Sequence, residues 1–160
     1  MSQSIFAEGT TRAEKYSTLL PQIRALVEGE KDFIANLSNI MGAIKVGMDF
    51  LWVGCYFVKQ NELVLGPFQG PVACTRIAFG KGVCGVCWER QEIIIVKNVD
   101  EFPGHIACNT ESKSEIAVPV FRNGKIGMVL DVDSNRLADF DETDRNFFQQ
   151  IALLIESLPE

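Results

Sequence analysis

The chain has 160 residues, of which 47% are hydrophobic and 22% are charged; it is long and apolar enough for one domain with a sizeable core, which excludes an extended disordered chain. Its 21 acidic and 15 basic residues give a net charge of -6. Long-range repulsion therefore argues against nucleic acid and anionic membranes as partners. No apolar run reaches the ~20 residues that a membrane span requires.

We expect a single domain over residues 1–160, in which residues 1–10 form a flexible N-terminal extension. This N-terminus lacks the basic start and apolar stretch of a secretory signal, which predicts a cytoplasmic protein. In a reducing cytosol, the five cysteines are expected to be free, metal-bound or catalytic rather than paired in structural disulfides.

Two amphipathic helices are predicted at the start of the domain. Thr11 and Glu14 have the spacing of a capping box, so a first helix is expected to begin there and to continue through Pro21. A second helix is expected from Lys31 onward. Their apolar stripes comprise Leu19, Ile23, Leu26 and Val27 in the first helix and Phe33, Ile34, Leu37, Ile40, Met41 and Ile44 in the second.

The middle of the chain alternates short apolar runs with turns and loops. We expect strands at residues 50–58, 63–65, 72–79 and 93–96, a turn at 60–62, a loop at 66–71, a short helix at 83–90 and a long irregular segment at 98–114. Trp52 and Tyr56 share one face of the first strand by parity. The plain interpretation is two core aromatics, and the alternative is the aromatic wall of a small-ligand pocket.

The C-terminal third contains the clearest signals. Ile116–Phe121 and Lys125–Asp133 read as strands joined through Asn123 and Gly124, which is typical of a tight hairpin because both residues accept positive φ. Asp141 is expected to cap a last helix. Its buried stripe comprises Phe147, Phe148, Ile151, Leu154 and Ile155. This order of elements predicts an α+β fold, with a central antiparallel sheet and helices packed on its faces.

Two carboxylates lie at the end of the last strand. Because strand side chains alternate, Asp131 and Asp133 project from the face opposite Leu130 and Val132. A solvated strand end is the commoner situation for Asp residues. The alternative is a carboxylate pair that lines a pocket, where it can hold an ammonium group. One carboxyl group, with its pKa raised by the other, can also supply a proton there.

The cysteines differ in what their surroundings predict. Cys55 lies in an apolar strand and is expected to be a buried, inert thiol. Cys84 and Cys87 form a CxxC motif, but the chain has no second CxxC and no His pair to complete a zinc site. Zinc bound with the help of Cys74 or Cys108 stays an alternative. The strand–helix context of a thioredoxin-like CxxC motif is also missing.

Cys108 lies in the long irregular segment, where a thiol is expected to be accessible. A nearby protonated His105 can stabilise a thiolate, although a single His is more often a hydrogen-bonded structural residue. Cys74 and Cys84 lie in or beside the preceding segment of loops and short elements. Three thiols in such places can converge on one pocket, but their spacing in the sequence leaves the convergence open.

Five segments together resemble a known family. They are Gly66-Pro-Phe-Gln-Gly, Gly82-Val-Cys84-Gly, Phe102-Pro-Gly-His-Ile-Ala-Cys108, Ser114-Glu115-Ile-Ala-Val-Pro119 and Leu130-Asp-Val-Asp133-Ser. In this order, over most of the chain, they resemble the free methionine-R-sulfoxide reductases, which are single GAF-domain enzymes. The Cys108 loop and the segment 131–134 are the most specific parts of the resemblance.

The resemblance implies a GAF domain that reduces the R epimer of free methionine sulfoxide, with thioredoxin as reductant, without cofactor or metal, and often as a homodimer. Cys108 matches the catalytic cysteine, and Cys84 and Cys74 match the two cysteines from which its disulfide partner is drawn. The substrate-pocket positions are matched by Trp52, Tyr56, Glu115, Asp131 and Asp133. Cys55 and Cys87 are outside the family's set of three cysteines, so Cys87 stays a competing partner for Cys84.

The implied chemistry places a geometric demand on the hairpin. A carboxylic acid, Glu115 or Asp133, is expected to give a proton to the sulfoxide oxygen while Cys108 attacks the sulfur. A regular two-residue hairpin, however, puts Glu115 on the face opposite Asp131 and Asp133. For all three to share a pocket, either a β-bulge is needed or Glu115 must lie before the regular strand. Pro119, which has no N–H, favours an irregularity in this strand and therefore a bulge.

Two other functions stay open on the residues alone. A GAF module can sense a nucleotide or small metabolite without chemistry, because a fold does not determine a function. A small cysteine-rich metal-binding protein is the other alternative.

Overall fold

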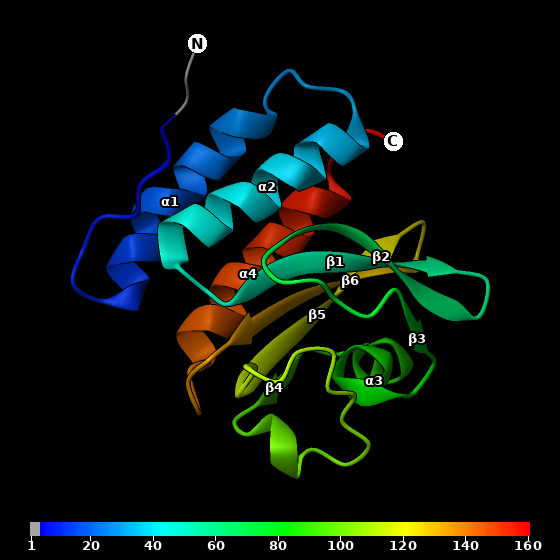
Figure 1. The fold of residues 1–160 in the computed structure, drawn as a ribbon. Helices are drawn as coiled ribbons and strands as arrows, with labels where there is room; N and C mark the ends of the chain where they lie inside the picture. Colours follow the sequence, from blue (N-terminus) through cyan, green and yellow to red (C-terminus); the bar gives the residue numbers. More distant parts are fainter. Residues whose placement is uncertain (1–3) are drawn as a thin grey trace.

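The computed structural model describes residues 4–160, which form an α+β domain as predicted (Figure 1). Its elements are α1 (Arg12–Val27), α2 (Phe33–Met48), β1 (Trp52–Lys59), β2 (Glu62–Gln69), β3 (Arg76–Ala78), α3 (Gly82–Arg90), β4 (Ile94–Val96), a 3-10 turn (Val99–Glu101), β5 (Ser114–Arg122), β6 (Lys125–Ser134) and α4 (Glu142–Glu156). The six strands pair antiparallel in the order β3-β2-β1-β6-β5-β4. Among residues 4–160, no helix has both the length and the apolar character needed to cross a membrane.

The sheet separates two apolar layers. Helices α1, α2 and α4 cover one face, and α3 lies on the other face with the long segment that precedes β5 (Figure 1). Strand alternation assigns side chains to these layers: Val53 and Cys55 join the three-helix side, whereas Trp52 and Tyr56 join the α3 side. On the α3 side, one helix and the surrounding loops cover the sheet, whereas three helices cover the other face.

The helix ends follow the local chemistry of the sequence. The predicted capping box of Thr11 and Glu14 starts α1, and Asp141 caps α4 through a second capping box with Asp144. Asp32 accepts a hydrogen bond from the backbone N–H of Ala35 and starts α2. The apolar stripes of all three helices face the core, except for Ile34 in α2, which is 50% exposed.

Two predicted boundaries in the middle of the chain are wrong. The segment 66–69, predicted as a loop, continues β2 along β1 beyond a register shift at Gly54 and Tyr56. Pro67 is tolerated in this strand because β3 pairs only with residues 62–64 and leaves the outer edge of β2 free. The third strand is correspondingly shorter than the predicted 72–79, since it begins at Arg76.

The predicted N-terminal extension lies partly outside the described residues, which begin at residue 4. Within the described part, the backbone N–H of Phe6 donates to Gln22 Oε1 at 3.3 Å, and that of Glu8 donates to Thr18 Oγ1 at 2.9 Å. These contacts place residues 6–8 along α1.

Asp144 joins α4 to α1 from a fully buried position. The Tyr16 hydroxyl donates to Asp144 Oδ1 at 2.5 Å, and Arg12 Nη1 lies 3.2 Å from the same oxygen. The backbone N–H of Asp141 donates to the other oxygen, Oδ2, at 2.8 Å. One carboxylate therefore satisfies a helix cap, a buried hydroxyl and a half-buried cation.

We predict that Asp144→Ala lowers the free energy of unfolding by about 3 kcal/mol, because the buried Tyr16 hydroxyl loses its acceptor and the Arg12 guanidinium keeps only Asp139 of its two carboxylate partners. Glu142→Ala, in the same helical turn but with a side chain that is 78% exposed, should change this free energy by less than about 0.5 kcal/mol. Urea unfolding followed by circular dichroism measures both. Equal effects of the two substitutions would contradict this role of Asp144.

Candidate active site

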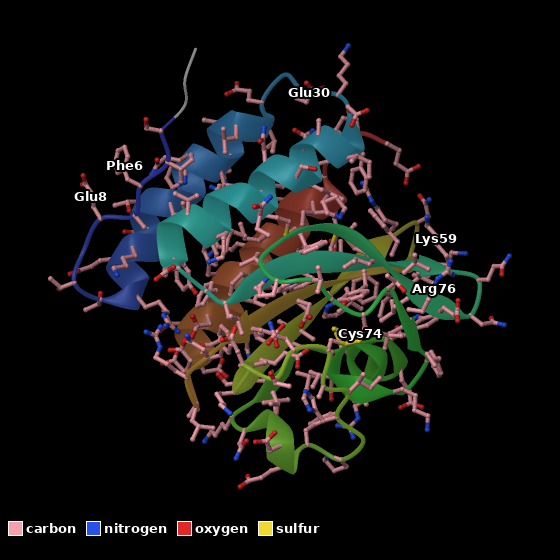
Figure 2. All side chains as sticks on the ribbon, in the orientation of Figure 1. Phe6, Glu8, Glu30, Lys59, Cys74 and Arg76 are labelled. Carbon is pink, nitrogen blue, oxygen red and sulfur yellow. A yellow bond between two sulfur atoms is a disulfide. The ribbon has the colours of Figure 1, made fainter. Side chains whose placement is uncertain are left out.

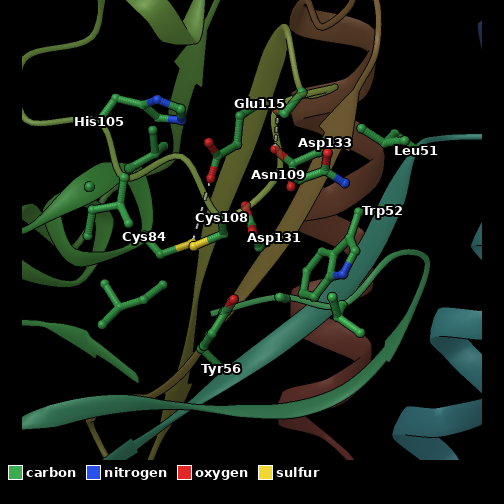
Figure 3. Close-up of a pocket in the computed structure, with 17 residues that line it drawn as sticks. Leu51, Trp52, Tyr56, Cys84, His105, Cys108, Asn109, Glu115, Asp131 and Asp133 are labelled. Atoms are coloured by element: carbon green, nitrogen blue, oxygen red, sulfur yellow. Dashed lines mark hydrogen bonds between the residues drawn. The ribbon is translucent and has the colours of Figure 1, made fainter. Parts of the chain in front are cut away.

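One cavity on the α3 side of the sheet brings the predicted site residues together (Figure 3). Its walls come from β1, α3, β5, β6 and the segment 105–112. Among its lining residues are Trp52, Tyr56, Cys84, Cys108, Glu115, Asp131 and Asp133. The remaining predicted residue, Cys74, is bonded to Cys108 through a disulfide, so all eight positions belong to one region of the structure.

A β-bulge puts the three carboxyl groups on one face of the β5–β6 hairpin. The pairing of Val120 with Met128 is followed by that of Phe121 with Ile126, which leaves Gly127 as an extra residue in β6. The resulting register pairs Glu115 with Asp133 and Ala117 with Asp131. The irregularity predicted near Pro119 is therefore present, one residue further along the strand.

Burial makes this carboxyl cluster retain protons. Loss of water raises the pKa of Glu115 well above its ordinary value, and the charges of Asp131 and Asp133 raise it further. Burial also raises the pKa of Asp131 and, with the charge of Asp131, raises that of Asp133 well above its ordinary value. Asp133 accepts a hydrogen bond from the Ser112 hydroxyl at 2.6 Å. The cluster can therefore keep a proton at pH values where an ordinary carboxyl group is ionised.

Cys84 lies at the first turn of α3 and points toward the carboxyl cluster. Its Sγ donates to Glu115 Oε1 over 3.7 Å (Figure 3). Burial raises the pKa of the Cys84 thiol well above its ordinary value, and the charges of Asp131 and Glu115 add to this effect. Cys84 is thus a protonated thiol rather than a nucleophile.

Cys74 and Cys108 form the disulfide, with their Cα atoms 5.3 Å apart (Figure 2 labels Cys74). The bond joins the loop between β2 and β3 to the loop before β5. Both residues are half-buried, whereas Cys55, Cys84 and Cys87 are free and buried. Cys55 is as buried as predicted, and burial raises the pKa of its thiol to about 12.

Trp52 and Tyr56 form an aromatic wall beside the carboxyl cluster. Their ring centroids are 6.0 Å apart, and the Phe68 ring also stacks on Trp52, with the centroids 5.3 Å apart. A Cβ at Gly54 would overlap the Trp52 ring, so glycine is needed for Trp52 to lie across the strand. The sequence predicts a loop at Phe68, so the stacking of its ring on Trp52 becomes apparent only because β2 continues to Gln69.

Ser112, Asn109 and Ile106 also line the cavity. Ile106 belongs to the segment around Cys108 that carries the family resemblance, but the sequence assigned a site role to none of these three residues. Their position depends on the path of the long loop, which has no periodicity to read. His105 lines the cavity as well, but burial lowers its pKa. It is therefore a poor source of the positive charge considered above for stabilising a thiolate.

The cavity offers a set of atoms that can hold a metal ion. Ligand atoms of Cys84, Glu115 and Asp131 lie within 4.8 Å of one another, and all three residues are buried. Cys87, the other half of the CxxC motif, does not belong to this group. Three ligands are fewer than the four of a structural zinc site.

The chain is similar in sequence and in structure to known GAF-domain proteins. The GAF domain family matches residues 32–158. GAF domain-containing protein A of Dictyostelium discoideum is 49% identical over 98% of this chain and 100% of its own. The free methionine-R-sulfoxide reductase of Saccharomyces cerevisiae is 40% identical over 94% of this chain and 88% of its own. An X-ray structure of that enzyme from Neisseria meningitidis, in complex with its substrate, matches with a TM-score of 0.93 and 45% identity, over 96% of this chain and 93% of that chain.

These matches extend over nearly the whole chain and include both sequence and fold. The chain therefore belongs to the GAF-domain family, in the branch that contains the free methionine-R-sulfoxide reductases. The fold and the family resemblance predicted from the sequence motifs are confirmed.

The carboxyl cluster predicts a pH-dependent stability. Folded Glu115 keeps a proton that the unfolded chain releases above pH ~4.3, so the folded state binds more protons and stability falls as pH rises above that value. Glu115→Gln cannot ionise, and the fall between about pH 5 and pH 8 should be smaller in this variant, by at most about 1.4 kcal/mol per pH unit.

Urea unfolding of the disulfide form at several pH values measures this difference. Glu142→Gln changes an exposed carboxyl group on α4 and serves as the matched control. The pH slope of the control should follow that of the unsubstituted protein. A slope for Glu115→Gln as steep as that of the control would show that Glu115 ionises normally in the folded state.

Proposed function

We propose that this chain reduces the R epimer of free L-methionine sulfoxide to methionine through a sulfenic acid on Cys108 and a disulfide with Cys74. The observation that carries the proposal is the cavity in which Cys108, bonded to Cys74, borders both a proton-bearing carboxyl cluster and an aromatic wall. The similarity to free methionine-R-sulfoxide reductases supports the same assignment.

In the first step, the thiolate of Cys108 attacks the electrophilic sulfur of the sulfoxide. The oxygen needs a proton to leave that sulfur, and protonated Glu115 or Asp133 supplies it. The oxygen passes to Cys108, methionine departs, and a sulfenic acid is left. The sulfoxide sulfur gains the two electrons that the cysteine sulfur loses.

In the second step, the thiol of Cys74 attacks the sulfur of the sulfenic acid, and water leaves with the oxygen. The disulfide between these two residues is the product of this step. Cys84 is the other candidate partner from the sequence, but it is free, buried and hydrogen-bonded to Glu115. We therefore assign Cys74 as the resolving cysteine and give Cys84 a supporting position in the cavity.

In the third step, an external dithiol reduces the disulfide and restores both thiols. We propose thioredoxin for this role, in the cytoplasm. The half-buried position of Cys74 and Cys108 gives a second protein access to the bond.

We also propose that the protein forms a homodimer. Size-exclusion chromatography with light scattering measures this oligomeric state.

The walls of the cavity suit a free amino acid that has an apolar end and a cationic end. The rings of Trp52 and Tyr56 can hold the methyl group, while the acidic side chains can hold the ammonium group. Asp131 Oδ1 is buried and has no hydrogen-bond partner among the described residues, so it is available to a donor on the substrate. A methionine sulfoxide residue inside a polypeptide would not fit such a site, because its main chain would have to leave the cavity on both sides.

We predict that the purified protein, with a dithiol reductant, converts free methionine-R-sulfoxide to methionine and leaves the S epimer and peptide-bound methionine sulfoxide unchanged. Cys108→Ser should lose this activity because it removes the nucleophile. Cys55→Ser, which alters a buried thiol on the opposite layer, is the matched control and should keep it. Chromatographic measurement of methionine decides, and full activity of Cys108→Ser would overturn the assignment.

We also predict that Cys74→Ser releases about one methionine per chain and then stops when thioredoxin is the only reductant, because no disulfide forms. Mass spectrometry after one turnover should find a sulfenic acid on Cys108 in this variant and the Cys74–Cys108 bridge in the unsubstituted protein. A bridge between Cys108 and Cys84 in the unsubstituted protein would contradict the assignment of Cys74.

A further inference from the structure

The polar ends of the two aromatic side chains hold the loop that carries Cys74. The Tyr56 hydroxyl donates to the backbone carbonyl of Cys74 at 3.1 Å, and the Trp52 indole Nε1–H donates to that of Pro71 at 3.1 Å. Burial raises the pKa of Tyr56, so its hydroxyl keeps the donated proton. In each residue, the ring therefore lines the cavity and the donor group forms a hydrogen bond with the loop.

The loop also packs closely on the aromatic wall. Gly70, where the loop begins, has a φ of 136°, and a Cβ there would lie 2.7 Å from the carbonyl oxygen of Leu51 and 2.8 Å from Cδ1 of Trp52. At the other end, the carbonyl of Thr75 accepts a hydrogen bond from the backbone N–H of Leu65 at 3.1 Å. These contacts hold Cys74 between two points fixed on β1 and β2.

This placement matters for the step that forms the disulfide. Attack by Cys74 on the sulfenic acid of Cys108 requires two sulfur atoms on separate loops to meet, and a held loop raises their effective concentration. The segment between Gly70 and Thr75 is a surface loop outside the strands, where loss of two hydrogen bonds allows many other conformations.

We propose that the Tyr56 hydroxyl and the Trp52 indole N–H are positioning groups that hold Cys74 ready to attack the oxidised Cys108, in addition to any contact that their rings make with substrate. The proposal rests on the proposed function for the origin of the sulfenic acid. In the step concerned, the S–O bond of Cys108 breaks, the bond between the two sulfurs forms, and the oxygen leaves as water with the thiol proton of Cys74.

The test compares two steps within one variant. In Tyr56→Phe the ring stays and the hydrogen bond to Cys74 is lost, so disulfide formation should slow about fivefold relative to methionine release. Rapid-quench samples from a single turnover give methionine by chromatography, and a sulfenic-acid trapping reagent gives the fraction of Cys108 that has not yet formed the bridge. The measured quantity is the rate of disulfide formation divided by the rate of methionine release.

Two further variants separate positioning from a general structural effect. In a Cys74→Ser background, adding Tyr56→Phe should not change the lifetime of the sulfenic acid, because no resolving thiol is left to position. Gly70→Ala, which forces the loop away from Trp52, should lower the same ratio as Tyr56→Phe does. The circular dichroism of each variant verifies that it is folded.

An unchanged ratio in folded Tyr56→Phe, or equal slowing of both steps, would overturn the proposal, since the hydroxyl would then act only on substrate or not at all. One equivalent of hydrogen peroxide provides a start that does not depend on methionine sulfoxide: it oxidises the Cys108 thiol to sulfenic acid and releases water. A slower bridge in Tyr56→Phe after peroxide supports the positioning role even if the unsubstituted protein reduces no methionine sulfoxide.

Discussion

The candidate site depends on three carboxyl groups held on one face of a hairpin, of which Glu115 and Asp131 are buried and Asp133 is partly buried. Glu115, Asp131 and Asp133 would repel one another if all were ionised, and burial adds a cost for each charge. Retained protons relieve that cost. The same physical condition that makes the cluster unfavourable for stability therefore supplies the acid that the proposed reduction requires.

The opposite layer of the sheet offsets this cost. The strand side chains that alternate with the acidic ones, such as Leu130 and Val132, are fully buried against α1, α2 and α4. One hairpin thus serves both purposes, with apolar side chains toward the helices and titratable side chains toward the cavity. Because the side-chain period of a strand is two, a shift of one residue in register would exchange the two sets.

The sequence carried enough information for the elements whose chemistry is local. The capping residues Thr11 and Asp141 and the Asn123-Gly124 turn lie where they were predicted, and alternation correctly placed Asp131 and Asp133 together. The register of Glu115 was not readable, because it depends on Gly127 being skipped in the pairing with β5. The extent of β2 was also misjudged, since Gly66 and Pro67 have loop propensity but gain a partner strand.

The meeting of Cys74 and Cys108 is the feature of the site that depends most on long-range tertiary structure. Cys74 and Cys108 are 34 residues apart and lie on two loops, so only the tertiary path of each loop brings them together. Cys84 and Cys87 carry the conspicuous motif but are buried on a short helix, where acidic neighbours disfavour a thiolate. In the proposed reaction, the resolving cysteine must meet the sulfur of Cys108 and then be reached by a reductant. A half-buried loop residue meets both demands, whereas a thiol enclosed among carboxyl groups meets neither.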